Sequence, residues 1–333
     1  MPVTGVYFIP AHPNASTALG NITERLRSSF PDEDLIQLGR WTLEQKLMRD
    51  TPGLLPTSSG PNQRPSKPRY MQFLSLSHYH NHGFIYTSEP TEKPFHPHNA
   101  ASPSPAATPA TPGLQGAGAG AGVGAGAGAA TTGSVNDSTT SNISPMLMTT
   151  VPHSSYSTLF QHFTYACQPF WCHRLTVVVQ NGVFYDIGDF RVRLGDVRQT
   201  YPTNRVRGAV VEIEWRGPSV IDSLDGAVTS DVNGETDSGV DVSLSALEES
   251  DVDAEFAATA LLIREFWVRV GVEGAREAIL VPGVGSEVKE RLVKIKGAKN
   301  TGGGLSGPTE DDPNPQAGTD VARQYMEVLR FNR

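Results

Sequence analysis

Cysteine is scarce in this sequence of 333 residues, which contains only Cys167 and Cys172. Two cysteines are too few for a scaffold stapled by disulfides. Their spacing supplies half of a zinc site at most, because a structural zinc site needs a second pair of ligands. We therefore expect free buried thiols, no metal and no cofactor, as is typical of a protein in a reducing compartment.

Long apolar runs are lacking as well, since hydrophobic residues make up 38% of the chain. The most apolar segment, residues 256–270, is interrupted by Arg264 and Glu265. A membrane-spanning helix needs about 20 apolar residues in succession. The first residues also lack the basic start and apolar stretch of a secretion signal. We expect no association with a membrane.

Basic residues are absent from one long segment. No Lys or Arg occurs between Gly217 and Arg264, whereas eleven acidic residues do. The whole chain has 27 basic and 35 acidic residues, so basic residues exceed acidic ones by 27 to 24 outside this segment. The net charge of −8 therefore belongs to one acidic insertion. A strongly positive surface for nucleic acid is excluded, and we expect no direct binding to nucleic acid.

Glycine and proline, by contrast, are abundant, with 33 and 25 residues that gather in segments of low complexity. Such segments bury too little apolar surface to offset the entropy of the chain. We predict a disordered Pro/Ser/Gly-Ala-rich insertion at 89–150, a disordered acidic insertion at 218–253 and a flexible linker at 297–319. The remaining parts form one domain and comprise residues 1–88, 151–217, a helix with its following segment at 254–296, and a C-terminal helix at 320–333.

Several segments have the periodicity of regular structure. β-branched and aromatic residues predict strands at 3–10, 69–77 and 83–88. Residues 35–49 are interpreted as a strand that ends near Leu43, with a helical continuation to Met48 as the alternative. Apolar stripes at helical spacing predict four helices. The first stripe consists of Leu19, Ile22 and Leu26, and the second, after a Ser154-Ser155 cap, of Tyr156, Leu159, Phe160 and Phe163. The third consists of Phe256, Ala260, Ile263, Trp267 and Val270, and the fourth of Val321, Tyr325, Val328 and Leu329.

The second half of the chain predicts an antiparallel meander. Residues 174–180 and 183–187 flank Asn181-Gly182, a dipeptide that favours the two-residue turn of a hairpin. Strands at 189–197 and 206–215 follow. Apolar residues in the last strand fall on both parities, so we expect a bulge or bend near Gly208. The predicted fold is α+β, with an antiparallel sheet closed or nearly closed into a barrel and three to four flanking helices, because closure removes exposed edges.

Three histidines alternate at His78, His80 and His82. On a strand they would share one face, and three imidazoles with an open fourth position suit a catalytic zinc. They stand, however, where the chain must reverse, and Asn81 and Gly83 are turn residues. We interpret the run as an exposed polar hairpin tip.

A second candidate site consists of carboxylates and arginines on predicted neighbouring strands. Such groups could ligate a divalent metal and clamp phosphates in a triphosphate-tunnel-like, metal-dependent phosphohydrolase. That chemistry needs a second carboxylate pair, and no other Glu-x-Glu occurs. The default interpretation is solvated cross-strand pairing. The sharper one is a protein-interaction face made of Arg191, Arg193, Arg205, Arg207, Glu212 and Glu214. No nucleotide-binding or nucleophile motif is found, so no catalytic residue is predicted.

Five segments that follow one another along the chain carry a family resemblance. They are MPVTGVYFIP (1–10), WTLEQKLMRD (41–50), RYMQFLSLSH (69–78), WCHR (171–174) and YDIGDFRVRLGDVRQ (185–199). Together they resemble the family of subunit 20 of the Mediator complex of RNA polymerase II transcription, in the form seen in filamentous fungi. The resemblance covers about 1–88 and 154–216, and the Gly-Ala tract and the acidic insertion depart from the family pattern.

The resemblance implies a nuclear coactivator subunit that is not an enzyme and has no cofactor. Members of the family belong to the head module of Mediator and form a direct heterodimer with subunit 18 through related β-barrels. Subunit 8 and other head subunits then tether the pair, and RNA polymerase II is reached through the assembled head. The resemblance implies a role in transcription regulation that rests on protein–protein interaction.

Overall fold

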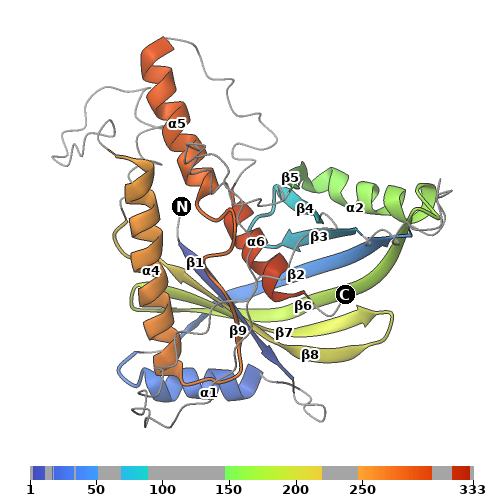
Figure 1. The fold of residues 1–333 in the computed structure, drawn as a ribbon. Coiled ribbons are helices and arrows are strands. Elements are labelled where there is room, and N and C mark those ends of the chain that lie inside the picture. Colours follow the sequence, from blue (N-terminus) through green and yellow to red (C-terminus); the bar gives the residue numbers. More distant parts are fainter. Residues whose placement is uncertain are drawn as a thin grey trace, which may run out of the picture. The chain divides into compact units, whose positions relative to one another are not determined.

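The computed structural model describes residues 3–11, 17, 19–33, 35–51, 69–88, 147–219, 247–301 and 317–330. Within these residues the chain folds into one antiparallel sheet with helices packed on it (Figure 1). The α+β class predicted from the sequence is confirmed. Most of the predicted insertions at 89–150, 218–253 and 297–319 lies outside the described residues.

The strands are β1 (Thr4–Pro10), β2 (Gln37–Asp50), β3 (Tyr70–Leu76), β4 (His82–Ser88), β5 (Leu147–Pro152), β6 (Trp171–Ile187), β7 (Phe190–Tyr201), β8 (Arg205–Trp215) and β9 (Arg276–Ala278). The helices are α1 (Leu19–Ser29), α2 (His153–Gln161) with its π-helical continuation η2 (His162–Ala166), α4 (Glu249–Val270), α5 (Ser286–Thr301) and α6 (Thr319–Val328). Regular structure thus extends into each predicted insertion, since β5 begins at Leu147, α4 begins at Glu249 and α5 ends at Thr301.

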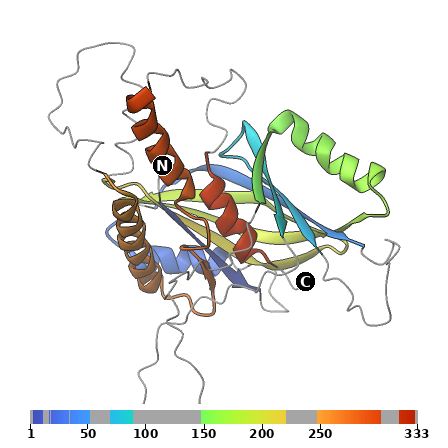
Figure 2. The same cartoon turned by 45° about the horizontal axis from the view of Figure 1, so that its top comes forward.

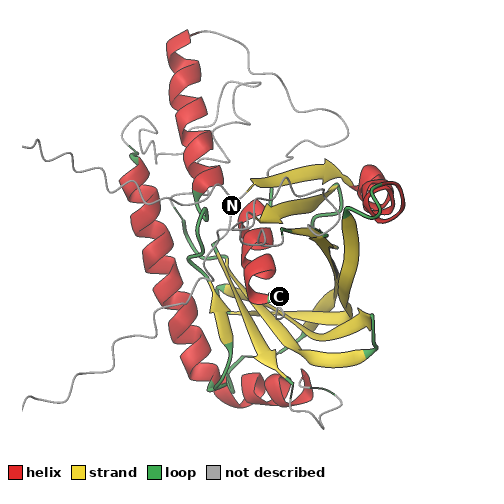
Figure 3. Ribbon diagram, turned by 45° about the vertical axis from the view of Figure 1, so that its right-hand side comes forward, coloured by secondary structure: helices red, strands yellow, loops and turns green. Residues whose placement is uncertain are grey.

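The sheet is open, and the predicted barrel is wrong. Its strand order is β5-β4-β3-β2-β6-β7-β8-β1-β9, so β5 and β9 are edges that do not pair with each other. One face is instead covered by α6, which contacts β1, β3 and β9 (Figure 3). A helix laid on the sheet buries the apolar side chains of that face, so closure is not needed to remove them from water.

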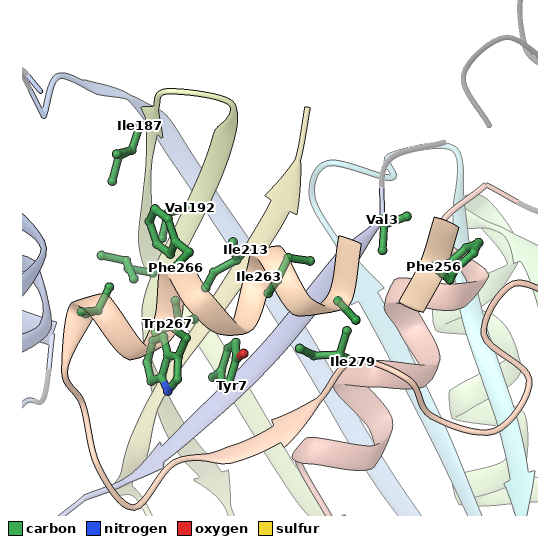
Figure 4. Close-up of a cluster of buried hydrophobic side chains, with 14 of the residues drawn as sticks. Val3, Tyr7, Ile187, Val192, Ile213, Phe256, Ile263, Phe266, Trp267 and Ile279 are labelled. Carbon is green, nitrogen blue, oxygen red and sulfur yellow. The ribbon is translucent and has the colours of Figure 1, made fainter. Parts of the chain in front are cut away.

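Both faces of the sheet are buried, as β1 shows. Val3 and Tyr7 belong to the cluster that includes residues of α1 and α4, and Tyr7 stacks on Trp267 of α4 with 4.2 Å between ring centroids (Figure 4). Val6 and Phe8, on the other parity, join the cluster formed with α6. Along β3 and β4 the first of these faces is covered by α2, which lies beside β4 and β5 (Figure 2).

The predicted hairpin at Asn181-Gly182 is wrong, because β6 runs through it as one strand of 17 residues. Both neighbours, β2 and β7, shift register at this point, so Asn181-Gly182 is a bulge. A Cβ atom on Gly182 would stand 2.4 Å from Nε1 of Trp41. Glycine fits here because the Trp41 indole packs directly against the backbone, where a side chain would stand. The chain turns at Gly188, whose φ is +55°.

Two other strand predictions have different outcomes. The strand starting near residue 35 does not end at Leu43 and does not become helical, because residues 43–49 pair with β3 on one side and with β6 on the other. The irregularity expected near Gly208 is confirmed by a register shift between β7 and β8. Apolar residues on both parities have a second explanation, however: Val210 and Val211 are both buried, one on each face, because helices cover both faces of the sheet.

The four predicted helices are confirmed as α1, α2, α4 and α6. In α4 the whole predicted apolar stripe is buried. A capping box between Glu248 and Asp251 opens this helix, and Gly271 closes it in the left-handed conformation that glycine favours. The cap predicted for α2 is displaced, since this helix begins at His153, after Pro152.

Candidate functional site

Three of the charged residues singled out in the sequence, Arg193, Glu212 and Glu214, meet in a buried cluster beneath α6. Arg193 on β7 donates hydrogen bonds from Nη1 to Oε1 of Glu212 at 2.5 Å and to Oε2 of Glu214 at 2.6 Å. The hydroxyl of Tyr325 on α6 donates to Oε2 of Glu212 at 2.5 Å. His78 lies 3.7 Å from the same oxygen. The expected solvated pairs are therefore buried, and Glu212 is 1% exposed.

Electrostatics keep this cluster ionised. Burial raises the pKa of a carboxyl group, but Arg193, His78 and the Tyr325 hydroxyl together outweigh burial and lower the pKa of Glu212. Burial and the Glu212 charge raise the pKa of Tyr325 well above 10, so its hydroxyl stays a donor. Burial also lowers the pKa of His78, although the nearby Glu212 charge opposes this shift. The net arrangement is a desolvated ion pair closed by a tyrosine.

A second set of polar contacts fixes the start of α6. Gln324 donates from Nε2 to the carbonyls of Thr4 at 2.7 Å and Ile279 at 2.8 Å, and its Oε1 accepts from the Thr4 hydroxyl at 2.7 Å. Asp320 accepts from the backbone N–H of Gly285 at 2.8 Å. Both N–H groups and the oxygen of the buried Gln324 head are thereby engaged, which ties α6 to β1 and to the chain after β9.

Glu287 of α5 completes this anchor. Its Oε2 accepts a hydrogen bond from the Thr319 hydroxyl at 2.9 Å, and the residue is 4% exposed. Burial, with the charge of Asp320, raises the pKa of Glu287 to about 8. The carboxyl group is therefore mostly protonated at neutral pH, which suits a buried acid that lies beside another acid.

The other predicted arginines occupy more accessible positions. Arg191 forms a bidentate pair with Asp186 of β6, at 2.7 and 2.9 Å. Arg205 is exposed and donates to Oε1 of Gln199 at 3.1 Å. Burial and the like charge of Arg205 lower the pKa of Arg207. The structure thus separates the six residues predicted as one face into buried members and accessible members.

The histidine run lies at the turn between β3 and β4, as expected, but it is not uniformly exposed. His80 is exposed, whereas His82 is 3% exposed and its Nε2 lies 2.8 Å from the carbonyl oxygen of Ala317. His78 enters the Glu212 cluster. The exposed-tip interpretation is therefore wrong for His78 and His82, because Glu212 lies beside His78 and Ala317 lies beside His82.

The part of the chain that the structure describes contains no group of three or more His, Cys, Asp or Glu side chains placed to hold a metal. His80 and His153 line a hollow of about 560 Å³ with Glu44, but Glu44 is paired with Lys46 at 2.8 Å. Both oxygens of Glu212 accept hydrogen bonds within the chain. The triphosphate-tunnel alternative is therefore unsupported. Among the described helices, none is long and apolar enough to cross a membrane.

Sequence reasoning missed Tyr325 and His78 as parts of the Glu212 cluster and Gln324 as part of the anchor of α6. The helical periodicity places Tyr325 in an apolar stripe, which is correct for its ring but says nothing of its hydroxyl. The only signal in the sequence is that a tyrosine and a glutamine stand where a buried stripe favours aliphatic residues. Glu212 and Tyr325 are 113 positions apart, so no local pattern links them.

Comparison with known proteins assigns the family. No curated protein matches the chain significantly. The family model described as the TATA-binding related factor (TRF) of subunit 20 of the Mediator complex matches residues 1–330. This match includes the helix α6 and the cluster beneath it. The chain therefore belongs to the Med20 family and has the role of a Mediator subunit in transcription regulation.

Proposed function

We propose that this chain is a non-enzymatic structural subunit of the Mediator head module, that it acts in the nucleus and that it pairs directly with subunit 18. The observation that carries the proposal is the family match over residues 1–330. In this role the chain would help to relay regulatory signals to RNA polymerase II through the assembled head. Subunit 8 and other head subunits would hold the pair in place.

The use of charged residues supports a binding role rather than a catalytic one. Arg193 and Tyr325 both donate hydrogen bonds to Glu212, and the Tyr325 bond holds α6 on the sheet. A catalytic carboxylate must instead reach substrate, metal or water. These residues are structural, and a contact with subunit 18 must use side chains that remain accessible.

Arg205 and Arg207, at the start of β8, are the members of the predicted face that suit such a contact. Arg205 is exposed, and Arg207 is close enough to it for the like charge to lower the Arg207 pKa. Two neighbouring guanidinium groups form a local positive site that an acidic segment would stabilise. We propose that subunit 18 presents carboxylates to this pair.

The test is co-expression with subunit 18, followed by size-exclusion chromatography with light scattering and by metal analysis of the peak. We expect a metal-free one-to-one heterodimer. Arg205→Glu combined with Arg207→Glu should weaken the heterodimer at least tenfold and reduce its salt dependence. Arg198→Glu is the matched control, because Arg198 is exposed on the adjacent strand β7. A chain that stays monomeric in the presence of subunit 18 would contradict the pairing. An unchanged affinity of the double variant for subunit 18 would contradict the contact surface.

A further inference from the structure

Helix α4 has a second apolar stripe that faces away from the sheet. Its buried stripe packs against β1 and β8. On its outer side Ala254, Leu261 and Val268 follow one another at intervals of seven residues, and all three are exposed. Leu261 is 64% and Val268 76% exposed. A seven-residue apolar repeat is the pattern by which one helix packs along another.

Two further alanines widen this stripe. Ala257 and Ala258 are exposed between Ala254 and Leu261. Small side chains let a neighbouring helix approach closely, at interaxial distances of about 8–10 Å. From Ala254 to Val268 the stripe is about 21 Å long, at 1.5 Å per residue. It is long enough for an approaching helix of about four turns.

One acidic side chain in the stripe, Glu265, forms no ion pair with a described residue. Glu265 is exposed between Leu261 and Val268. The nearest basic side chains are engaged elsewhere: Arg264 bonds to Glu277 at 2.7 Å, and the guanidinium of Arg269 lies 4.4 Å from the ring centroid of Phe30. The outer face of α4 is thus an apolar stripe with a negative charge in it, which a basic side chain of a partner would complement.

This charge argues against two occupants from the chain itself. Residues 220–246 and 302–316, which flank α4 and α5 in the sequence, contain no Lys or Arg. A second copy of the chain fits no better. An antiparallel copy centred on Leu261 would set Glu265 against Ala257, and a parallel copy would set two Glu265 side chains side by side.

We propose that the outer stripe of α4 docks an amphipathic helix of another Mediator subunit, with a Lys or Arg opposite Glu265. The inference rests on membership of a subunit family of a multi-subunit complex, and not on the pairing with subunit 18. Bulky apolar residues of the partner would fit over Ala254, Ala257 and Ala258. Leu261 and Val268 would anchor the contact.

The first test places a photo-crosslinking amino acid at position 261 of the full chain in the purified Mediator complex. Mass spectrometry of the crosslinked peptides identifies what covers the stripe. We expect one segment of a different subunit, with apolar residues at helical spacing and a basic residue beside them. Crosslinks to residues of the same chain, crosslinks between two copies, or no crosslink in the intact complex would each overturn the proposal.

The second test measures incorporation into the complex in competition with the unchanged chain. Leu261→Glu and Val268→Glu should each reduce incorporation at least tenfold, and Glu265→Lys should do so through repulsion. Val293→Glu is the matched control, since Val293 is 57% exposed on α5. Unchanged incorporation of the stripe variants would refute the proposal. Binding of subunit 18 is measured in parallel with the same variants. This measurement distinguishes a failure of the docking proposal from a failure of the proposed heterodimer.

Discussion

Replacing Arg193 by methionine should destabilise the isolated chain by about 3–5 kcal/mol at neutral pH, the cost of leaving a buried charge without its partner. Glu212 is 1% exposed and has Arg193 as its nearest cation, at 2.5 Å. Methionine keeps most of the side-chain volume, so the loss reports on charge rather than on packing. Removing the buried pair, with Arg193→Met and Glu212→Gln together, should recover part of the stability, because Glu214 still loses its bond to Arg193.

The pH dependence of this loss gives the sharper result. In the unchanged chain the pKa of Glu212 is lowered, so its stabilising contribution is present above the unfolded value of about 4.5 and disappears as pH falls through the folded value. Without Arg193 burial dominates and the folded pKa rises above the unfolded one. The cost of Arg193→Met should therefore be smallest at the acidic end of the range and should grow as pH rises above about 4.5, by up to about 1.4 kcal/mol per pH unit.

Urea unfolding of the full chain between pH 4.5 and 8, followed by tryptophan fluorescence and circular dichroism, measures this effect. Arg191→Met is the control, because Arg191 is bonded to the half-exposed Asp186 at the edge of the same face. A cost for Arg193→Met below about 1 kcal/mol, or one that does not change with pH, would refute the assignment of Glu212 as a buried, ionised acid.

Two further predictions concern close packing and the anchor of α6. Gly182→Ala should lower the melting temperature, since the added Cβ would stand 2.4 Å from Trp41, at a cost of about 1–3 kcal/mol. Gly20→Ala in α1 should be neutral or stabilising, because a Cβ added there would meet nothing within 4 Å outside its own helix turn. The raised pKa of Glu287, about 8, makes its folded form the stronger proton binder, so its contribution to stability is full below about pH 4.5 and is lost as pH rises toward 8. Glu287→Gln should therefore gain stability relative to the unchanged chain over that range in urea titrations, and identical pH profiles would contradict the burial of this acid.

The sequence by itself determined most of the local elements. Strand β1 and helices α1, α4 and α6 follow from periodicities within one segment, which burial on a sheet then satisfies. The family was also accessible from the sequence, because short segments such as residues 41–50 and 185–199 carry the resemblance that the family match over residues 1–330 confirms.

Only the tertiary structure decided how the strands pair and which helices cover the faces of the sheet. Asn181-Gly182 has the chemistry of a turn, but pairing with strands on both sides holds it as a bulge in β6. The alternation around Arg193 and Glu212 shows that these residues share a face, but whether that face meets water depends on α6, more than a hundred positions away. Whether a charge is buried depends on all the elements packed around it, so the residues of a strand cannot show that a helix distant in the sequence will cover them.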